Sequence, residues 1–211
     1  EERWHVANYA SSLGKDGQKV QSDNTVVKAD RIEGDLPTTP DDTVWSTRTP
    51  STFNLVPQLI GKERFFTPSF DTITVRAIYN SKEIAILLEW DDRTKSLPGD
   101  QTAISIADAP IQQDAVAIQL PISMPEGMEK PYFGMGDVAN PVNLWHWKSG
   151  DTSTPEMVQL LNAKGFTDLT PREAASIGLQ AKGVYAKGTW KVLMRRPLTT
   201  DTGHNDLQIQ E

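Results

Sequence analysis

The sequence predicts a mainly β protein, an antiparallel, immunoglobulin-like β-sandwich with short helical excursions. Several short stretches alternate apolar and polar residues, turn signals separate them, and few stretches show the 3.6-residue period of a helix. The chain has 211 residues, of which 37% are hydrophobic and 23% charged. This composition suits one globular domain with a sizeable core.

The N-terminal part of the chain predicts a helix, a linker and an extended segment. Residues 1–14 have the apolar spacing of a short helix that ends at Gly14, a favourable C-cap. Residues 15–29 are mostly polar and are typical of a linker. Prolines recur through residues 34–60, so a long helix is excluded there and extended chain with edge strands is expected.

Strand signals begin at residue 72. Apolar and polar residues alternate in "TITVRAIYN" and in "SKEIAILLEWDD", and "NSKE" at their junction is a good hairpin turn. Further strands are expected at "DAVAIQLPIS", at "PVNLWHWKS" and, after a hairpin turn at "AKG", at "TWKVLMRR". Two short helical pieces are expected to begin at "TPEM" and "TPREAA", each with proline at the first helical position.

Charge and cysteine content exclude several classes of site. The net charge of -7 argues against a general nucleic-acid binder, which usually carries a basic surface. The chain has no cysteine, so it forms no disulfide, thiolate zinc site, iron–sulfur cluster or covalent haem c attachment of its own. No apolar run approaches the roughly 18 residues of a membrane span, so an integral membrane protein is not expected.

No catalytic motif stands out. The three histidines, His5, His146 and His204, are far apart and lack a metal-ligand spacing, and the chain has no nucleophile elbow, P-loop or dinucleotide fingerprint. Asp91 and Asp92 follow a strand and suit either a cation site or a solvated turn. The six tryptophans suit either a sugar-stacking platform or a sandwich core, and the apolar pattern around Trp45 and Trp90 favours the core for these two.

Met135 is in an unusual setting for a methionine. It lies in "FGMGD", where Gly134 and Gly136 deny it the packing of a regular helix or strand. Glycines on both sides allow a flat ligand to approach the backbone, and a thioether is a soft ligand for haem iron. An exposed loop methionine with no ligand remains the alternative from local chemistry alone.

Four stretches carry a family resemblance. "VRAIYNSKEIAILLEWDDRTKS", "DAVAIQLPI", "PYFGMGDVANPVNLWHWKSG" and "GVYAKGTWKVLMRRPL" resemble, in this order, the haem-binding domain of the ethylbenzene dehydrogenase γ-subunit family. The similarity covers about residues 30–200. The family includes γ-subunits of dimethylsulfide dehydrogenase, selenate reductase and chlorate reductase, and related domains of nitrate and nitrite oxidoreductases. The resemblance implies a β-sandwich with one non-covalent haem b that carries electrons and catalyses no substrate reaction itself.

The resemblance also implies the haem ligands. In the family, a methionine and a lysine ligate the iron, and Met135 falls at the methionine position. Gly134 and Gly136 are expected to give the porphyrin access to the backbone. Trp145 and Trp147 are expected to wall the pocket or support it.

The second ligand is expected outside the sequence. The family's lysine belongs to a strand block some distance after "RRPL", and no such block occurs before Glu211. We therefore expect the lysine beyond Glu211, with Lys182, Lys187, Lys191 and His146 as alternatives within the chain. Residues 1–211 alone are then expected to bind haem weakly or with a high-spin, five-coordinate spectrum.

These expectations divide the chain into three parts. Residues 1–14 resemble the last helix of a class I cytochrome c, residues 15–29 form a linker, and residues 30–211 form a haem b domain, incomplete at its C-terminus. No CxxCH motif precedes the first part, so haem c is expected only on an upstream domain. A simple helix packed on the sandwich is the alternative for residues 1–14.

The implied partners are a molybdenum-containing catalytic subunit and an iron–sulfur subunit, or a soluble cytochrome. The same resemblance implies an exported, periplasm-facing location. Two other functions stay open. One is a carbohydrate- or partner-binding β-sandwich module without haem, and the other is a structural sandwich that docks a larger complex.

Overall fold

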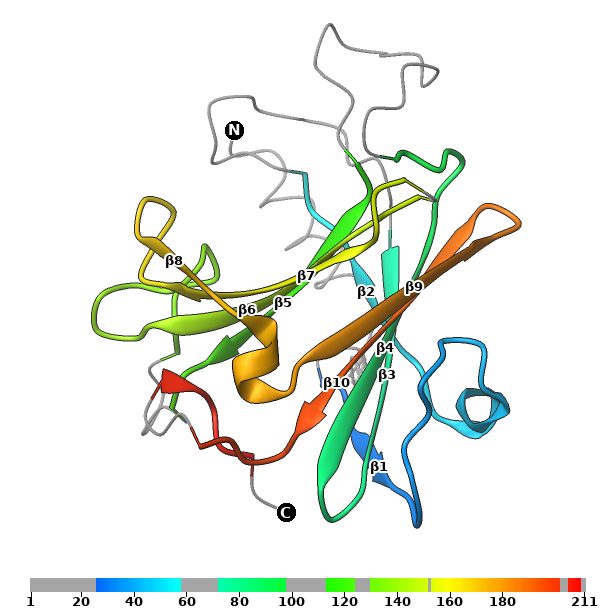
Figure 1. The fold of residues 1–211 in the computed structure, drawn as a ribbon, viewed down its shortest axis with the longest axis horizontal. Coiled ribbons are helices and arrows are strands. Elements are labelled where there is room, and N and C mark those ends of the chain that lie inside the picture. Colours follow the sequence, from blue (N-terminus) through cyan, green and yellow to red (C-terminus); the bar gives the residue numbers. More distant parts are fainter. Residues whose placement is uncertain are drawn as a thin grey trace, which may run out of the picture.

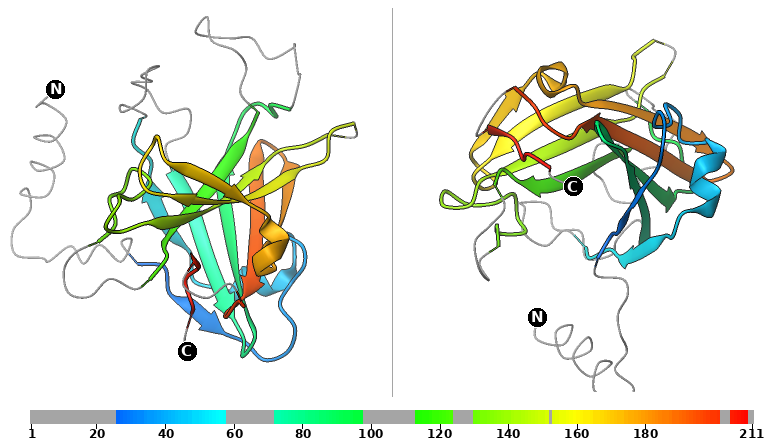
Figure 2. Two further views of the ribbon diagram at one scale, coloured as in Figure 1. Left: turned by 60° about the vertical axis from the view of Figure 1, so that its left-hand side comes forward. Right: turned by 90° about the horizontal axis from the view of Figure 1, so that it is seen from below.

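Two β-sheets pack face to face (Figures 1 and 2). This computed structural model describes residues 26–57, 72–97, 113–123, 130–151, 153–201 and 205–209, so the predictions for residues 1–14 and for most of the linker lie outside it. The first sheet has six strands, in the order β1-β3-β4-β10-β9 with β2 also paired to β3. The second has four, in the order β5-β6-β7-β8. Together they confirm the predicted mainly β sandwich.

The strands of the six-stranded sheet come from both ends of the described chain. They are β1 (Ala29–Arg31), β2 (Ser51–Asn54), β3 (Thr72–Tyr79), β4 (Glu83–Asp91), β9 (Gln180–Ala186) and β10 (Thr189–Pro197). All neighbours are antiparallel except β1, which is parallel to β3. The predicted hairpin turns at "NSKE" and at the "AKG" of residues 186–188 are confirmed, because β3 leads directly into β4 and β9 into β10.

The four-stranded sheet is a continuous antiparallel meander. Its strands are β5 (Ala115–Pro121), β6 (Val142–Lys148), β7 (Met157–Ala163) and β8 (Leu169–Arg172). The predicted strands at "DAVAIQLPIS" and "PVNLWHWKS" become β5 and β6. After β8, the one-turn helix η3 (Ala174–Ile177) returns the chain to the first sheet.

The two predicted helices of this region were largely wrong. "TPEM" leads into strand β7, because residues 157–163 pair with β6 along their whole length. Leu160 faces the core between the sheets while Leu161 faces the other way, so pairing with β6 overrides local helix preference. "TPREAA" gives β8 and then only the short 3-10 turn η3, which ends at Gly178 with a φ of 65°.

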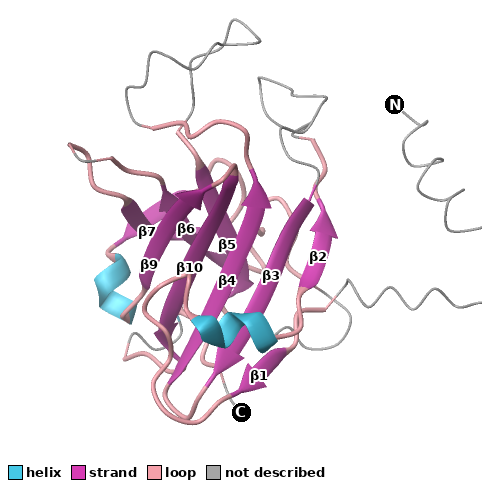
Figure 3. Ribbon diagram, turned by 90° about the vertical axis from the view of Figure 1, so that its right-hand side faces the viewer, coloured by secondary structure: helices cyan, strands magenta, loops and turns pink. Residues whose placement is uncertain are grey.

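The outer face of the six-stranded sheet is covered by the proline-containing segment between β1 and β2. The 3-10 turn η2 (Thr43–Thr47) lies across this face (Figure 3). Trp45 and Leu36 from this segment pack against Ile78, Leu87 and Leu193. The buried position of Trp45 confirms its predicted role in the core.

Tryptophans dominate the core between the sheets. Trp90 and Trp190 stack at 6.3 Å between ring centroids, and the Trp147 ring meets Trp190 edge-on at 5.0 Å. All five tryptophans in the described residues are at most 5% exposed, namely Trp45, Trp90, Trp145, Trp147 and Trp190. None of these five can form an open platform for a sugar ring.

The C-terminal segment 205–209 bridges the two sheets (Figure 2). The Ile209 N–H donates to the Leu198 carbonyl at 3.0 Å, directly after β10, so this segment has a backbone partner on the six-stranded sheet side. In the described part of the chain, no helix is long and apolar enough to cross a membrane.

Candidate functional site

Met135 occupies a strained turn just before β6. Its φ is 67°, in the left-handed region that residues other than glycine adopt at an energetic cost. Gly136 follows with a φ of 72°. We call residues 132–136 the Met135 turn. Such strain persists only where surrounding contacts impose it, and it is frequent at functional positions.

Hydrogen bonds hold the backbone of Met135 from both sides. The Met135 N–H donates to Gln119 Oε1 at 3.0 Å, and the Met135 carbonyl accepts from the Gly165 N–H at 2.9 Å. The Gly136 N–H closes the turn by donating to the Tyr132 carbonyl at 2.9 Å. Strand β5 and the β7–β8 turn therefore both fix this residue.

The Met135 side chain lies against the outer face of the four-stranded sheet. It packs on a small apolar cluster formed by Val142 and Leu144 of β6 and Leu161 and Ala163 of β7. In both strands these residues alternate with residues that face the core, so the cluster points away from the six-stranded sheet. Met135 is half-buried there.

Exposed apolar side chains gather around this sheet. Eight large hydrophobic residues of the described chain are exposed, and six of them lie on the four-stranded sheet or its connecting loops: Tyr132, Phe133, Val138, Met157, Phe166 and Leu169. Phe133, directly in the Met135 turn, is 72% exposed. Met157 is at the far end of β7 from the apolar cluster, and the other five lie nearer the Met135 turn. Exposed apolar side chains gathered in one region commonly mark a binding site.

The two glycines beside Met135 are close to protein atoms. A Cβ atom on Gly134 would lie 2.6 Å from the Tyr132 ring and 2.7 Å from the Phe166 ring. A Cβ atom on Gly136 would lie 2.8 Å from the Asn140 carbonyl oxygen. Packing within the loop therefore requires both glycines, which is a different reason from the porphyrin access that the sequence suggested.

Trp145 and Trp147 do not share the face of Met135. Both are in the core cluster between the sheets, on the inner face of β6. The Trp147 Nε1–H donates to Glu156 Oε2 at 2.7 Å, and the same oxygen accepts from the Gly183 N–H of β9 at 2.8 Å. These tryptophans support β6 from behind and do not line the surface that Met135 occupies.

His146 is on the same face as Met135. It follows Leu144 by two residues in β6, and it pairs with Ala117 of β5 and Gln159 of β7. Burial, and next the positive charge of Lys148, lower the pKa of His146, while a hydrogen bond with Gln159 opposes the shift. The imidazole is therefore favoured in its neutral form, which keeps a nitrogen lone pair.

The three alternative lysines lie on the other sheet. Lys182 pairs with Leu193, whose side chain packs beneath Trp45 on the outer face of the six-stranded sheet. Lys191 forms an ion pair with Asp41 at 3.2 Å. Lys187 is in the β9–β10 turn with a φ of 53°. None of them shares the sheet on which Met135 lies.

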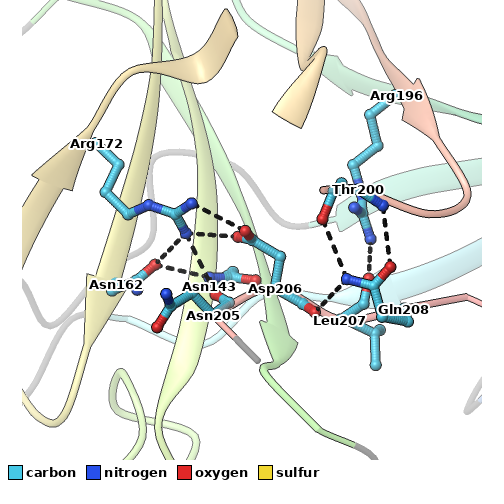
Figure 4. Close-up of polar contacts among 9 residues, drawn as sticks. All are labelled: Asn143, Asn162, Arg172, Arg196, Thr200, Asn205, Asp206, Leu207 and Gln208. Carbon is cyan, nitrogen blue, oxygen red and sulfur yellow. Dashed lines mark hydrogen bonds and ion pairs between the residues drawn. The ribbon is translucent and has the colours of Figure 1, made fainter. Parts of the chain in front are cut away.

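A cluster of polar side chains holds the C-terminal segment 205–209 against the four-stranded sheet (Figure 4). Arg172 of β8 donates to both carboxylate oxygens of Asp206, at 2.7 and 2.9 Å. Asn143, on the inner face of β6, donates to Asn162 Oδ1 and to the Asn205 carbonyl. Because Asn143 directly follows Val142 of the apolar cluster, these bonds hold β6 where it supports Met135.

The buried Arg196 forms part of the same cluster. Its guanidinium lies 5.1 Å from the centre of the Trp145 ring and donates to the Leu207 carbonyl (Figure 4). Burial lowers the pKa of Arg196, and the nearby Asp206 carboxylate opposes this shift. The hydrogen bond from the buried Arg196 guanidinium to Leu207 therefore connects the C-terminal segment to β10.

Asp91 and Asp92 have structural roles at the end of β4. Asp91 Oδ1 accepts from the Thr189 hydroxyl at 3.1 Å, and Asp92 Oδ1 accepts from the Thr94 N–H at 3.0 Å. No group of three or more His, Cys, Asp or Glu side chains suited to a metal ion occurs among the described residues. The hydrogen bonds of both aspartates favour a turn over a cation site, but the predicted solvation is wrong for Asp92, which is only 4% exposed.

Sequence reasoning missed Gln119 and Gly165. Gln119 occupies a polar position in an alternating strand, where glutamine is ordinary. Gly165 is in a connecting turn of the kind that glycine commonly occupies. Their contacts with Met135 span 16 and 30 positions of the chain, and no local pattern encodes such contacts.

Comparisons with known proteins match the larger part of the chain. The model of a family described as ethylbenzene dehydrogenase matches residues 42–169. A protein of Haloferax mediterranei named as a respiratory nitrate reductase heme subunit is 28% identical over 135 residues, covering 63% of this chain and 42% of the relative. The chlorate reductase subunit gamma of Ideonella dechloratans is 29% identical over 132 residues, covering 63% of this chain and 48% of the relative.

This chain spans less than half the length of both relatives. Among solved structures, a family 9 carbohydrate binding module from Caldicellulosiruptor kristjanssonii in complex with glucose aligns with a TM-score of 0.41 and 14% identity. That alignment covers 81% of this chain and 70% of the module. A likeness this weak has no bearing on function.

Proposed function

Because this chain belongs to the ethylbenzene dehydrogenase family, we propose that it is an electron-transfer haem b protein, similar to a γ-subunit, with Met135 as an axial ligand of the iron. The observation that carries the proposal is the conformation of Met135. Its backbone is strained and is held by hydrogen bonds at both its N–H and its carbonyl, and its side chain packs on an apolar face of the sheet. The names of the two relatives, a heme subunit and a gamma subunit of reductases, support the same class.

The residues around Met135 offer apolar contacts to a haem. Porphyrin is a flat apolar ring, and Val142, Leu144, Leu161 and Ala163 form an apolar floor beside the thioether. Val142, Leu144 and Ala163 are at most 5% exposed, so the apolar surface open to a porphyrin comes from Met135, Leu161 and the exposed side chains around them. Exposed aromatic residues border this floor, including Phe133 and Phe166. Since the chain has no cysteine, a haem here is held without thioether links to the protein, as in haem b.

The chain itself supplies binding, orientation and burial. The thioether of Met135 is a neutral, soft ligand that adds no charge to the site. The hydrogen bonds from Gln119 and Gly165 hold its backbone in place, and the apolar floor excludes water from that side. When bound, haem supplies reversible one-electron chemistry, which needs no general acid or base from the protein.

For the second axial ligand, we propose the lysine that the family resemblance implies, outside residues 1–211. Lys182, Lys187 and Lys191 belong to the other sheet, which argues against them. His146 is the alternative on the face of Met135. In a protein that includes the proposed lysine, a His146→Leu variant is expected to keep the low-spin haem spectrum, and loss of that spectrum would make His146 the ligand.

The proposed partners are a molybdenum-containing catalytic subunit and an iron–sulfur subunit, with a downstream carrier such as a soluble cytochrome. Both relatives are named as subunits of reductases, which supports this proposal. We also propose an exported, periplasm-facing protein, with haem c only on an upstream domain. Finding the native protein in the cytoplasmic fraction would contradict the proposed location.

The experiment compares haem binding in three proteins. The wild type, a Met135→Ala variant and a Met157→Ala control are loaded with haem b, and haem content and absorption spectra are recorded. Met157 is an exposed methionine of β7, outside the apolar floor, so its loss should leave the spectrum unchanged. The Met135→Ala variant should lose haem or change its spectrum.

A different outcome would point to the alternative function. A wild type that takes up no haem but binds glycans would support the carbohydrate-binding module. A Met135→Ala variant with the haem content and spectrum of the wild type would remove Met135 from the iron.

A further inference from the structure

Gln119 contacts the Met135 turn through both ends of its side-chain amide. Its Oε1 accepts from the Met135 N–H at 3.0 Å, and its Nε2 donates to the Tyr132 carbonyl at 3.1 Å. Only one orientation of the amide satisfies both groups, because an N–H needs an acceptor and a carbonyl needs a donor. One side chain therefore connects the beginning and the centre of the turn.

The backbone of Met135 needs such support. A residue with a Cβ atom adopts a φ of 67° only at an energetic cost, so the turn relaxes unless it is held. The Gly165 N–H holds the carbonyl of Met135 at 2.9 Å, but the N–H of Met135 depends on Gln119. The same side chain supports the Tyr132 carbonyl, to which the Gly136 N–H also donates.

Gln119 is itself held on a rigid element. It is in β5 and pairs with Leu144 of β6, a residue of the apolar floor on which Met135 packs. Directly paired residues of antiparallel strands share a face. The sheet therefore fixes the distance between the amide of Gln119 and the surface that carries the thioether.

We propose that Gln119 is a positioning residue that holds the Met135 thioether on the haem iron. This inference rests on the proposed function. A thioether is a neutral ligand without charge attraction to the iron, so its coordination is sensitive to how well its position is fixed in advance. Replacing Gln119 removes two hydrogen bonds of the turn but keeps Met135 in the chain, so any loss of coordination reports on positioning alone.

The test uses the haem-loaded protein with the proposed second ligand, the lysine, included, because the readout requires a six-coordinate iron, and it has a matched control. Gln119→Leu removes both hydrogen bonds at similar volume. Gln159→Leu is the control. Gln159, in β7, lies on the same face of the four-stranded sheet as Gln119, but it contacts His146 and not the Met135 turn. Gln119→Glu keeps an acceptor for the Met135 N–H but has no donor for the Tyr132 carbonyl, so it separates the contributions of the two hydrogen bonds.

The readouts are the near-infrared charge-transfer band of thioether-ligated ferric haem and the reduction potential. With two hydrogen bonds lost, the equilibrium constant for release of the thioether is expected to rise roughly 10- to 100-fold in Gln119→Leu. The band should weaken and the potential should fall, since a methionine ligand raises the potential. Gln119→Glu, which keeps one of the two hydrogen bonds, should weaken the band less than Gln119→Leu, and Gln159→Leu should leave the band unchanged.

A band and potential in Gln119→Leu equal to those of Gln159→Leu would overturn the inference. If Gln119→Leu does not fold, Gln119→Ala, which adds no bulk, gives the same reading. Failure of the proposed function would give a different result, because Met135→Ala itself would then leave the band unchanged. A Met135→Ala variant without the band, beside a Gln119 variant that keeps it, would refute only the role of Gln119.

Discussion

The ion pair between Arg172 and Asp206 is predicted to hold the C-terminal segment against the sheet that carries Met135. The Asp206 carboxylate is 0% exposed, and Arg172 donates to both of its oxygens (Figure 4). Replacing Asp206 with alanine leaves a guanidinium without its charge partner. Removing one member of a buried pair typically costs about 3–5 kcal/mol.

The expected loss lies at the lower end of that range. Arg172 is 18% exposed and keeps bonds to Asn162 Oδ1 and to the Asn205 carbonyl, so water and these oxygens partly compensate. We therefore expect Asp206→Ala to lower the free energy of unfolding by about 3 kcal/mol. This is a large part of the roughly 5–15 kcal/mol that stabilises a typical domain.

Urea unfolding, followed by tryptophan fluorescence, measures this loss. Asp201→Ala is the matched control, because Asp201 is exposed and lies in the same C-terminal region. A double variant, Arg172→Met with Asp206→Leu, should recover only part of the stability, since Arg172 no longer lacks its charge partner but the buried Arg196 still loses the nearby Asp206 carboxylate. A free energy of unfolding for Asp206→Ala within about 0.5 kcal/mol of the Asp201→Ala value would refute the reasoning.

Two further predictions concern the core and the pH dependence of stability. Gly183→Ala should lower the thermal midpoint of the apoprotein, because its Cβ atom would lie 2.1 Å from the Trp147 ring; an unchanged midpoint would show that the ring moves freely. Burial raises the pKa of Asp114 to about 6, with the Asp92 carboxylate contributing, and hydrogen bonds from Trp190 and Ser96 opposing the shift. Since the folded pKa lies above the unfolded value, the stabilisation from protonated Asp114 is complete below about pH 4 and is lost as the pH rises through about 6. Urea midpoints between pH 4 and 8 should show this fall in the wild type and not in Asp114→Asn, and identical profiles would contradict the assignment.

Strand positions could be predicted from the sequence because their cause is local. Alternation places Leu88 and Trp90 on one face of β4, and both are in the core between the sheets. The helix predicted after "TPEM" fails for the opposite reason. Nothing near residues 157–163 encodes their pairing with β6, and that pairing decides their structure.

The candidate site could also be predicted from the sequence only in part. Met135 could be identified because two glycines and a methionine are adjacent in the sequence. Its supports could not be identified, since Gln119 and Gly165 reach it only through the fold. The alternation in β6 already separates Trp145 from Leu144, but only the structure shows which of these faces carries Met135.

The central claim is that the Met135 thioether binds haem iron, and iron X-ray absorption of the haem-loaded protein tests it most directly. The measurement detects a sulfur atom bound to iron, and the chain has five methionines and no cysteine, so any such sulfur is a thioether. We predict one sulfur neighbour in the wild type and in Met157→Ala, and none in Met135→Ala. A wild type without a sulfur neighbour, or a Met135→Ala variant that keeps one, would contradict the claim.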